Sequence, residues 1–133
     1  MQLSVVIPVR NEAENILPLL AEIHAALEGG NAGRADFEVV YVDDGSSDAT
    51  PARLAEAMAR HPRLRVLAHA ESCGQSAALL TGFRAARGEW IATLDGDGQN
   101  DPADIPKLIA ARDGNVHLSL IAGYRKSRRD TWL

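Results

Sequence analysis

The chain has 133 residues, of which 46% are hydrophobic and 24% charged, and its formal net charge is −4. This composition is typical of a globular domain and argues against a broadly basic, nucleic-acid-binding surface. No apolar run approaches the roughly 18 residues of a membrane span, so we expect no transmembrane helix within these residues. The single cysteine, Cys73, excludes an internal disulfide and favours a reducing, cytoplasmic location.

Five apolar segments have the length and composition of β-strands. They are Leu3–Val9, Phe37–Asp43, Leu64–Ala70, Trp90–Asp95 and Val116–Gly123. In the first, second and fourth of these segments the apolar residues follow one another without alternation. That pattern is typical of strands covered on both faces, as in a parallel sheet.

Between these segments the apolar residues take a helical spacing. The first stripe is Ile16, Leu19, Leu20, Ile23 and Leu27; the third is Leu79, Leu80, Phe83 and Ala86; the fourth is Ile105, Leu108 and Ile109. We expect Asn11 to cap the first helix with Glu14 in a capping box, Pro51 to open the second, and Gly88 to end the third. The alternation predicts an α/β layered fold with a mostly parallel sheet and right-handed crossovers.

Three of the predicted strands end in polar sequences, Pro8–Glu12, Asp43–Asp48 and Asp95–Asp101. In an open parallel sheet, ligands bind beyond the carboxyl ends of the strands, so we expect the three sequences to meet at one edge. The first two also have a plain structural interpretation, as a helix cap and an Asx-turn. The third is harder to explain in that way, because it places carboxylates in close succession after a buried strand.

The Asp95–Gly96–Asp97 sequence, with Gln99 beyond it, predicts a divalent cation site. Carboxylate and carboxamide oxygens are hard donors that suit Mg²⁺ or Mn²⁺, and the glycine permits close approach of a ligand. An EF-hand is excluded, because its positions 6 and 12 would be Asn100 and Pro106. The sequence also contains neither a dinucleotide-binding G-x-G-x-x-G nor a P-loop.

Four motifs, in order, resemble those of the family 2 glycosyltransferases. They are SVVIPVRNEAENI, VVYVDDGSSDAT, CGQSAALLTGFRAARGEWIATLDGDGQNDPADIPKL and AGYRKSRRDTW. The sequence is most similar to the branch of dolichol-phosphate mannosyltransferases and undecaprenyl-phosphate sugar transferases. The resemblance implies a GT-A fold, an α/β layered fold that binds a nucleotide-diphosphosugar. It also implies that residues 1–133 are one such domain, the N-terminal part of a longer enzyme.

The resemblance assigns roles to individual residues. Pro8, Arg10, Glu12, Asp43, Asp44, Gln75 and Ser76 would lie along the nucleotide, with Asp44 against a base N–H. Many relatives carry an aromatic residue in place of Arg10, and Phe or Val in place of Cys73. Asp95 and Gly96 would face the ribose or sugar, and Asp97 and Gln99 would hold the metal, with Asp97 also catalytic.

The acceptor is expected at the end of the chain. Residues 125–133 carry four basic side chains and one acidic one, whereas the remainder is acidic overall. A charge run of this kind is often only solvated. By resemblance, Arg125 would be catalytic and, with Arg128 and Arg129, would bind the phosphate of a polyprenyl (dolichyl or undecaprenyl) lipid.

The expected activity is therefore inverting transfer of a sugar from a UDP- or GDP-sugar to a polyprenyl phosphate, at the cytoplasmic face of a membrane. Three alternatives stay open: a nucleotide-sugar-binding module without turnover, a transferase acting on a sugar hydroxyl, and a receiver-like phosphoacceptor domain. The receiver would require acidic residues after the first strand, where the chain has Pro8–Glu12. The sequence leaves the oligomeric state open, a homo-oligomer included.

Overall fold

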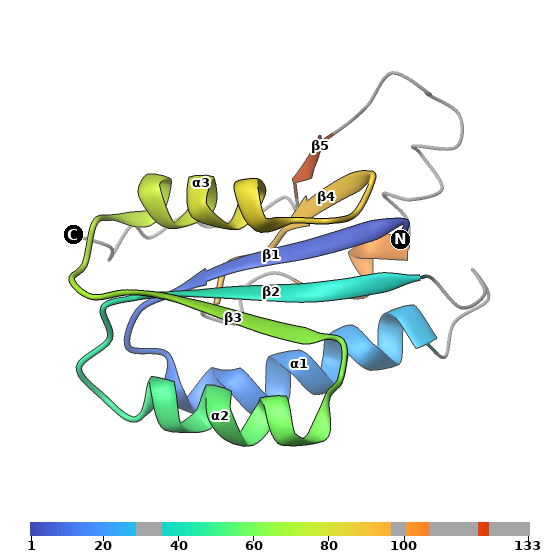
Figure 1. The fold of residues 1–133 in the computed structure, drawn as a ribbon. Coiled ribbons are helices and arrows are strands. Elements are labelled where there is room, and N and C mark those ends of the chain that lie inside the picture. Colours follow the sequence, from blue (N-terminus) through green and yellow to red (C-terminus); the bar gives the residue numbers. More distant parts are fainter. Residues whose placement is uncertain (29–35, 97–100, 107–119, 123–133) are drawn as a thin grey trace.

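The structure, a computed structural model, describes residues 1–28, 36–96, 101–106 and 120–122. Its elements in chain order are β1 (Leu3–Val9), α1 (Ala13–Glu28), β2 (Phe37–Asp44), α2 (Thr50–Arg60), β3 (Leu64–His69), α3 (Gln75–Ala85), β4 (Trp90–Thr93) and β5 (Leu120–Ala122). The strands form one sheet in the order β3–β2–β1–β4–β5, and every neighbouring pair is parallel (Figure 1). The predicted α/β layered fold with a parallel sheet is confirmed.

Helices cover both faces of the sheet, with α3 on one side and α1 and α2 on the other (Figure 1). All residues of β1 and β2, the central strands, are buried, in agreement with their uninterrupted apolar sequences. Alternate residues of these strands therefore enter two cores. Val5 and Tyr41 pack with α1 and α2, and Val6 and Val42 pack against α3.

Several element boundaries differ from the prediction. β3 and β4 are shorter than expected, β2 continues to Asp44, and only Leu120–Ala122 of the predicted fifth strand is described. The described part of the fourth helical segment is one turn over residues 104–106. In α1, the predicted apolar stripe is buried as expected, although Pro18 lies inside the helix.

Two expected helix signals were wrong. Asn11 does not cap α1, because its backbone has a φ of 55° and its side-chain oxygen accepts hydrogen bonds from the N–H groups of Ser47 and Asp48. Gly88 does not end α3, which ends at Ala85. A Cβ at Gly88 would meet the backbone of Leu3 and Ser4, so this glycine serves close packing against β1.

The buried side of α3 differs from the apolar stripe predicted for that helix. Ala78 and Gly82 are the buried residues of α3, and Leu80 is 47% exposed. The helix is turned so that Gly82 approaches the sheet, where a Cβ would overlap the side chain of Val6. Pro51 lies in the first turn of α2, as predicted.

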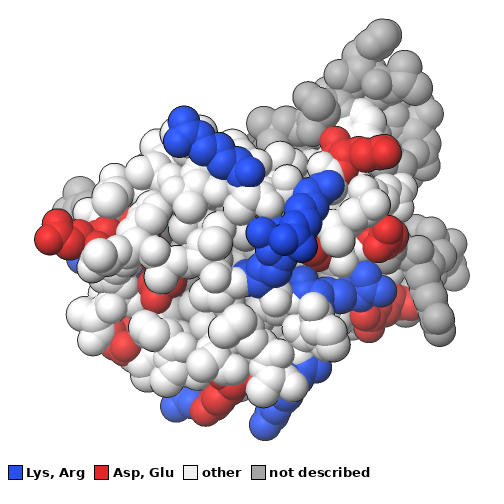
Figure 2. Space-filling view, in the orientation of Figure 1, with Lys and Arg blue, Asp and Glu red and all other residues white. Residues whose placement is uncertain are grey.

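Charged side chains of both signs lie on the face seen in Figure 2, with a group of arginine side chains near its centre. Two arginines of the β3 region are paired: Arg65 contacts Glu38 at 2.8 Å and Arg63 contacts Glu28 at 3.3 Å. Among the described residues, no helix has both the length and the apolar character needed to cross a membrane.

Candidate functional site

The carboxyl ends of β1, β2 and β3 are aligned by the register of the sheet. Val9 is paired with Asp43, and Asp44 is paired with His69 on the next strand. Because all strands are parallel, the segments that follow them lie at the same edge. The structure thus brings Pro8 and Arg10 to the same edge as the two aspartates, as the strand ends predicted.

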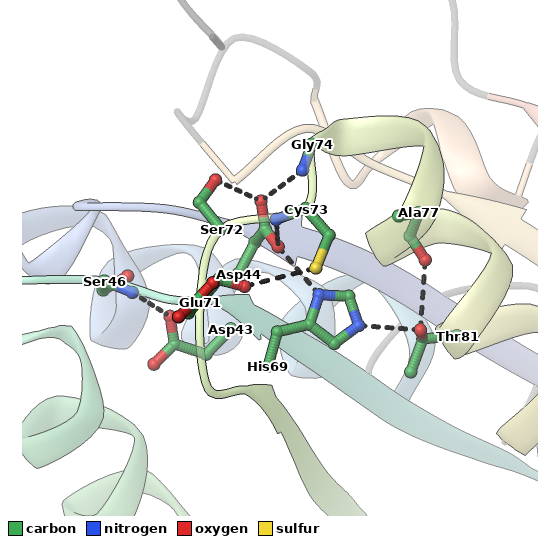
Figure 3. Close-up of polar contacts among 10 residues, drawn as sticks. All are labelled: Asp43, Asp44, Ser46, His69, Glu71, Ser72, Cys73, Gly74, Ala77 and Thr81. Atoms are coloured by element: carbon green, nitrogen blue, oxygen red, sulfur yellow. Dashed lines mark hydrogen bonds and ion pairs between the residues drawn. The ribbon is translucent and has the colours of Figure 1, made fainter.

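The Asp44 carboxylate is the centre of this edge (Figure 3). It is fully buried, and four donors surround it: His69 Nδ1 at 2.7 Å, Ser72 Oγ at 2.8 Å, and the N–H groups of Cys73 at 2.8 Å and Gly74 at 2.9 Å. Each oxygen accepts two of these contacts, which is the ordinary capacity of a carboxylate oxygen. Asp44 therefore anchors the segment between β3 and α3.

The environment of Asp44 keeps it ionised. Burial alone would raise the pKa of this carboxyl, but the hydrogen bonds from the Cys73 N–H, His69, Ser72 and the Gly74 N–H outweigh burial. Together they lower the pKa from 3.8 to about 2. A permanent negative charge thus lies beneath the loop that precedes α3.

His69 links this carboxylate to α3. Its Nδ1 faces Asp44, and its Nε2 lies 2.8 Å from Thr81 Oγ1, whose hydroxyl is 3.0 Å from the carbonyl oxygen of Ala77. His69 and Ser72 were not among the residues singled out from the sequence. The available signal was the position of His69 at the carboxyl end of a predicted strand, where ligand-binding side chains gather.

The segment after β1 is joined to the segment after β2. The Asn11 N–H donates to Ser46 Oγ at 2.9 Å, and the Glu12 N–H donates to Thr50 Oγ1 at 3.0 Å. Asp43, also buried, accepts a hydrogen bond from the Ser46 N–H at 3.1 Å, and Asp48 accepts one from the Thr50 N–H at 2.8 Å, the i to i+2 spacing of the expected Asx-turn. Arg10 and Glu12 are half-buried at this junction.

The segment after β3 contacts the segment after β2 and the end of β4. A Cβ at Gly45, which has a φ of 67°, would lie 2.5 Å from the Ser72 nitrogen. Gln75, the first residue of α3, donates from Nε2 to Asp95 Oδ1 at 3.2 Å. Ser76 follows in the first turn and is exposed. Gln75 and Asp95, both predicted as site residues, are therefore in contact.

The end of β4 lies against the end of β1. A Cβ at the buried Gly96 would overlap Val9 Cγ1 and lie 3.1 Å from the Pro8 carbonyl oxygen, so glycine is needed for the chain to lie against the end of β1. This close approach places the Asp95 carboxylate beside the other strand ends. Hard oxygen donors in such a position suit Mg²⁺ or Mn²⁺.

Five predicted site residues lie outside the described residues: Asp97, Gln99, Arg125, Arg128 and Arg129. The described part of the predicted site consists of Pro8, Arg10, Glu12, Asp43, Asp44, Gln75, Ser76, Asp95 and Gly96. It is an acidic, hydrogen-bonded edge of the sheet, built from four chain segments.

Comparison with known proteins identifies relatives of the chain. The family described as "Glycosyl transferase family 2" matches residues 4–133. The dodecaprenyl-phosphate galacturonate synthase of Rhizobium johnstonii is 38% identical over 131 residues, which are 98% of this chain and 38% of that protein. The undecaprenyl-phosphate 4-deoxy-4-formamido-L-arabinose transferase of an Enterobacter species is 39% identical over 133 residues, which are 98% of this chain and 39% of that protein.

Solved structures with the same fold include a mannosyltransferase and the protein TarS. The mannosyltransferase PcManGT of Pyrobaculum calidifontis, in complex with GDP-Man and Mn²⁺, has a TM-score of 0.69 and 29% identity; the match covers 81% of this chain and 31% of that one. Residues 1–349 of TarS from S. aureus, in complex with UDP-GlcNAc, have a TM-score of 0.70 and 25% identity, covering 87% of this chain and 32% of that one. The fold is thus of the GT-A type, and the chain spans less than two-fifths of the length of the curated relatives above.

Proposed function

The chain belongs to glycosyl transferase family 2, and from this premise we propose that it is the donor-binding part of a metal-dependent, inverting glycosyltransferase. The donor is a UDP- or GDP-sugar and the acceptor is a polyprenyl phosphate. The names of two relatives pair a polyprenyl phosphate with a sugar, and two similar structures contain GDP-Man or UDP-GlcNAc. The structure with GDP-Man also contains Mn²⁺.

The observation that carries the proposal is the contact between Gln75 and Asp95, made at an edge that Asp44 holds together. It joins the first turn of α3 to the end of β4, and both lie beside the ends of β1 and β2. A nucleotide-diphosphosugar is long enough to contact all of these segments at once.

We assign the nucleotide to Pro8, Arg10, Glu12, Asp43, Asp44, Gln75 and Ser76, and the ribose or sugar to Asp95 and Gly96. The Asp44 carboxylate already accepts four hydrogen bonds. We propose that it also holds the Ser72–Gly74 loop in shape, beside the contact with a base N–H that the resemblance implies.

Cleavage of the bond between the anomeric carbon and the diphosphate oxygen leaves negative charge on the nucleoside diphosphate. Mg²⁺ or Mn²⁺ held by Asp97 and Gln99 would supply Lewis-acid stabilisation of that charge. Asp95 and Gln75 orient the donor so that the anomeric carbon faces the acceptor. Attack from the side opposite the leaving group inverts the configuration.

A lipid phosphate is already ionised near pH 7 and needs no strong general base. It needs positioning, and the charge-assisted, bidentate hydrogen bonds of arginine suit a phosphate. We assign this role to Arg125, with Arg128 and Arg129 in the same basic segment. Because the acceptor is a lipid, we place the full-length protein at the cytoplasmic face of a membrane.

A second candidate function is donor binding without turnover. The described residues that carry it are those of the strand-end contacts alone, because the residues expected to bind the metal and the acceptor, Asp97 and Arg125, lie outside the described residues. Binding of the nucleotide and transfer of the sugar can be measured separately, and calorimetry measures the binding. A transfer assay with the lipid phosphate then distinguishes an enzyme from a binding module.

Calorimetry of UDP and GDP, each with and without Mn²⁺, tests the proposal. We expect one nucleotide to bind with an affinity that depends on Mn²⁺, and we expect Asp97→Asn to remove that dependence. Glu22→Gln, an exposed change on α1, is the matched control and should leave binding unchanged. Equal affinity of the wild type in all four conditions would make the carboxylates at the end of β4 structural.

A further inference from the structure

Three chemically different metal-binding groups meet on the α3 side of the sheet. One carboxylate oxygen of Asp44, one ring nitrogen of His69 and Sγ of Cys73 all lie within 4.8 Å of one another. They come from the ends of β2 and β3 and from the loop before α3, and Figure 3 shows them facing a common point. Three such ligands from separate segments form a candidate ligand set for a metal ion.

The His69 ring is held in the orientation that a metal ligand requires. The Thr81 hydroxyl lies within hydrogen-bond reach of the Ala77 carbonyl oxygen, so its Oγ1 can accept a hydrogen bond from Nε2–H of His69. Metal-ligating histidines typically donate their second ring N–H to an oxygen in this way. Nδ1 is then the nitrogen that faces Asp44 Oδ1, at 2.7 Å, and a metal ion would bind it by displacing the proton that lies between these two atoms.

The distances leave room for a tetrahedral ion after a small movement. Zn²⁺ binds N and O ligands at about 2.0–2.2 Å and S at about 2.3 Å, which separates neighbouring ligand atoms by roughly 3.3–3.7 Å. Cys73 is exposed, and its thiol makes only a 3.3 Å contact with the Glu71 carbonyl oxygen. Rotation of this side chain brings the sulfur closer, and Asp44 Oδ1 and His69 Nδ1, which lie 2.7 Å apart, must separate to about 3.3 Å.

We propose that Asp44, His69 and Cys73 form a binding site for Zn²⁺, separate from the oxygen-ligand site expected at Asp97. The ion replaces the proton shared by the Asp44 carboxylate and Nδ1 of His69, and the thiol binds as thiolate after releasing its own proton. A combination of thiolate, imidazole and carboxylate selects a borderline-soft ion over Mg²⁺. Its fourth position is open to water or to a ligand.

Co²⁺ is the probe for this site, because a thiolate bound to tetrahedral Co²⁺ gives a sulfur-to-metal charge-transfer band and intense visible d–d bands. Titration of the 133-residue chain with Co²⁺, without thiol reductant, should produce both. Stoichiometric Zn²⁺ should abolish them, and a large excess of Mg²⁺ should leave them unchanged. Zn²⁺ should also raise Tm, since a ligand of the folded state stabilises it by mass action.

Two variants identify the ligands. Cys73→Ser should lose the charge-transfer band, and His69→Asn should lose the tetrahedral spectrum. The asparagine amide can still donate to Asp44, so this variant keeps the loop in place, which far-ultraviolet circular dichroism checks. His61→Gln is the matched control, because the rings of His24 and His61 lie 4.5 Å apart and form another pair of imidazoles that Co²⁺ could bind.

His61→Gln should keep the spectrum of the wild type. The proposal is overturned if the wild type gives no charge-transfer band. It is equally overturned if His69→Asn retains the tetrahedral spectrum, because the exposed thiol alone would then be binding an adventitious ion.

Discussion

Nδ1 of His69 lies 2.7 Å from Oδ1 of Asp44, at the point where β3 and β2 end side by side. The carboxylate is fully buried, while the imidazole is partly buried and reaches α3 through Thr81. This contact connects the strand ends with the helix that begins at Gln75.

The two sides of the His69 ring can be tested separately. His69→Asn places an amide nitrogen near the position of Nδ1 and keeps the donor to Asp44, whereas His69→Gln places one near Nε2 and keeps the contact with Thr81. We expect His69→Gln to lower the free energy of unfolding by about 1–3 kcal/mol, because a buried carboxylate loses a donor, and His69→Asn to lower it less. Urea unfolding measures both. The opposite ranking would show that the Thr81 contact is the more important one.

Stability should depend on pH through Asp44. Its pKa is about 2 in the folded chain, below the ordinary 3.8, so the stabilisation is fully present above about pH 4. As pH falls below about 4, the unfolded chain takes up the proton before the folded chain does. The stabilisation, roughly 2 kcal/mol, is therefore lost progressively until pH has fallen through about 2.

Asp44→Asn should remove that part of the acid sensitivity and should itself be destabilising. Urea unfolding between pH 5 and pH 2 measures how steeply the free energy of unfolding changes with pH. The pKa values of Glu38 and Asp48 are also lowered, so the free energy of unfolding of the variant still falls somewhat as pH falls. A variant as acid-sensitive as the wild type would contradict the assignment of the lowered pKa to Asp44.

Glu38 is a buried carboxylate in β2 that joins distant segments. It accepts hydrogen bonds from Ser4 Oγ at 2.6 Å, from Arg65 Nη1 at 2.8 Å and from the Arg87 N–H at 2.7 Å. Burial would raise its pKa, but these hydrogen bonds and the charge of Arg65 lower it.

Glu38→Gln should lower the free energy of unfolding by about 1–3 kcal/mol, because one of the three acceptor contacts becomes a donor facing a donor. Guanidinium unfolding provides the measurement. Glu56→Gln, which loses only an exposed pair with Arg53, is the control and should change stability by less than about 0.5 kcal/mol. Similar effects of the two variants would mean that Glu38 contributes no more than a surface charge.

Gly96→Ala should destabilise the chain by about 1–3 kcal/mol, because the new methyl group overlaps Val9 in a packed region. We expect nucleotide affinity to fall as well, since the displaced backbone carries Asp95. Val9→Ala in the same chain should restore part of both losses by making space, although the Pro8 carbonyl oxygen remains close. Thermal unfolding and calorimetry follow the two quantities. Failure of the double variant to recover either one would place the effect of Gly96 elsewhere than at Val9.

Much of the fold follows from local patterns. The uninterrupted apolar sequences of β1 and β2 predict burial on both faces, and the spacing of Ile16, Leu20 and Ile23 predicts the buried side of α1. Patterns of this kind depend on backbone periodicity, which every residue of an element shares. The polar sequences that follow the strands also indicated the ligand-binding edge, because parallel strands all end on the same side.

The tertiary structure decided which group each polar side chain contacts. Asn11 binds the turn after β2 instead of capping α1, Leu80 faces solvent because Gly82 contacts the sheet, and Glu38 is buried by contacts with Ser4, Arg65 and the Arg87 N–H. The donors to Asp44 lie 25 to 30 residues away in sequence. Such contacts depend on strand order and on the path of each loop, which no local pattern encodes. The sequence alone therefore determined the fold class and the edge that carries the site, and only the assembled sheet determined which residues surround Asp44.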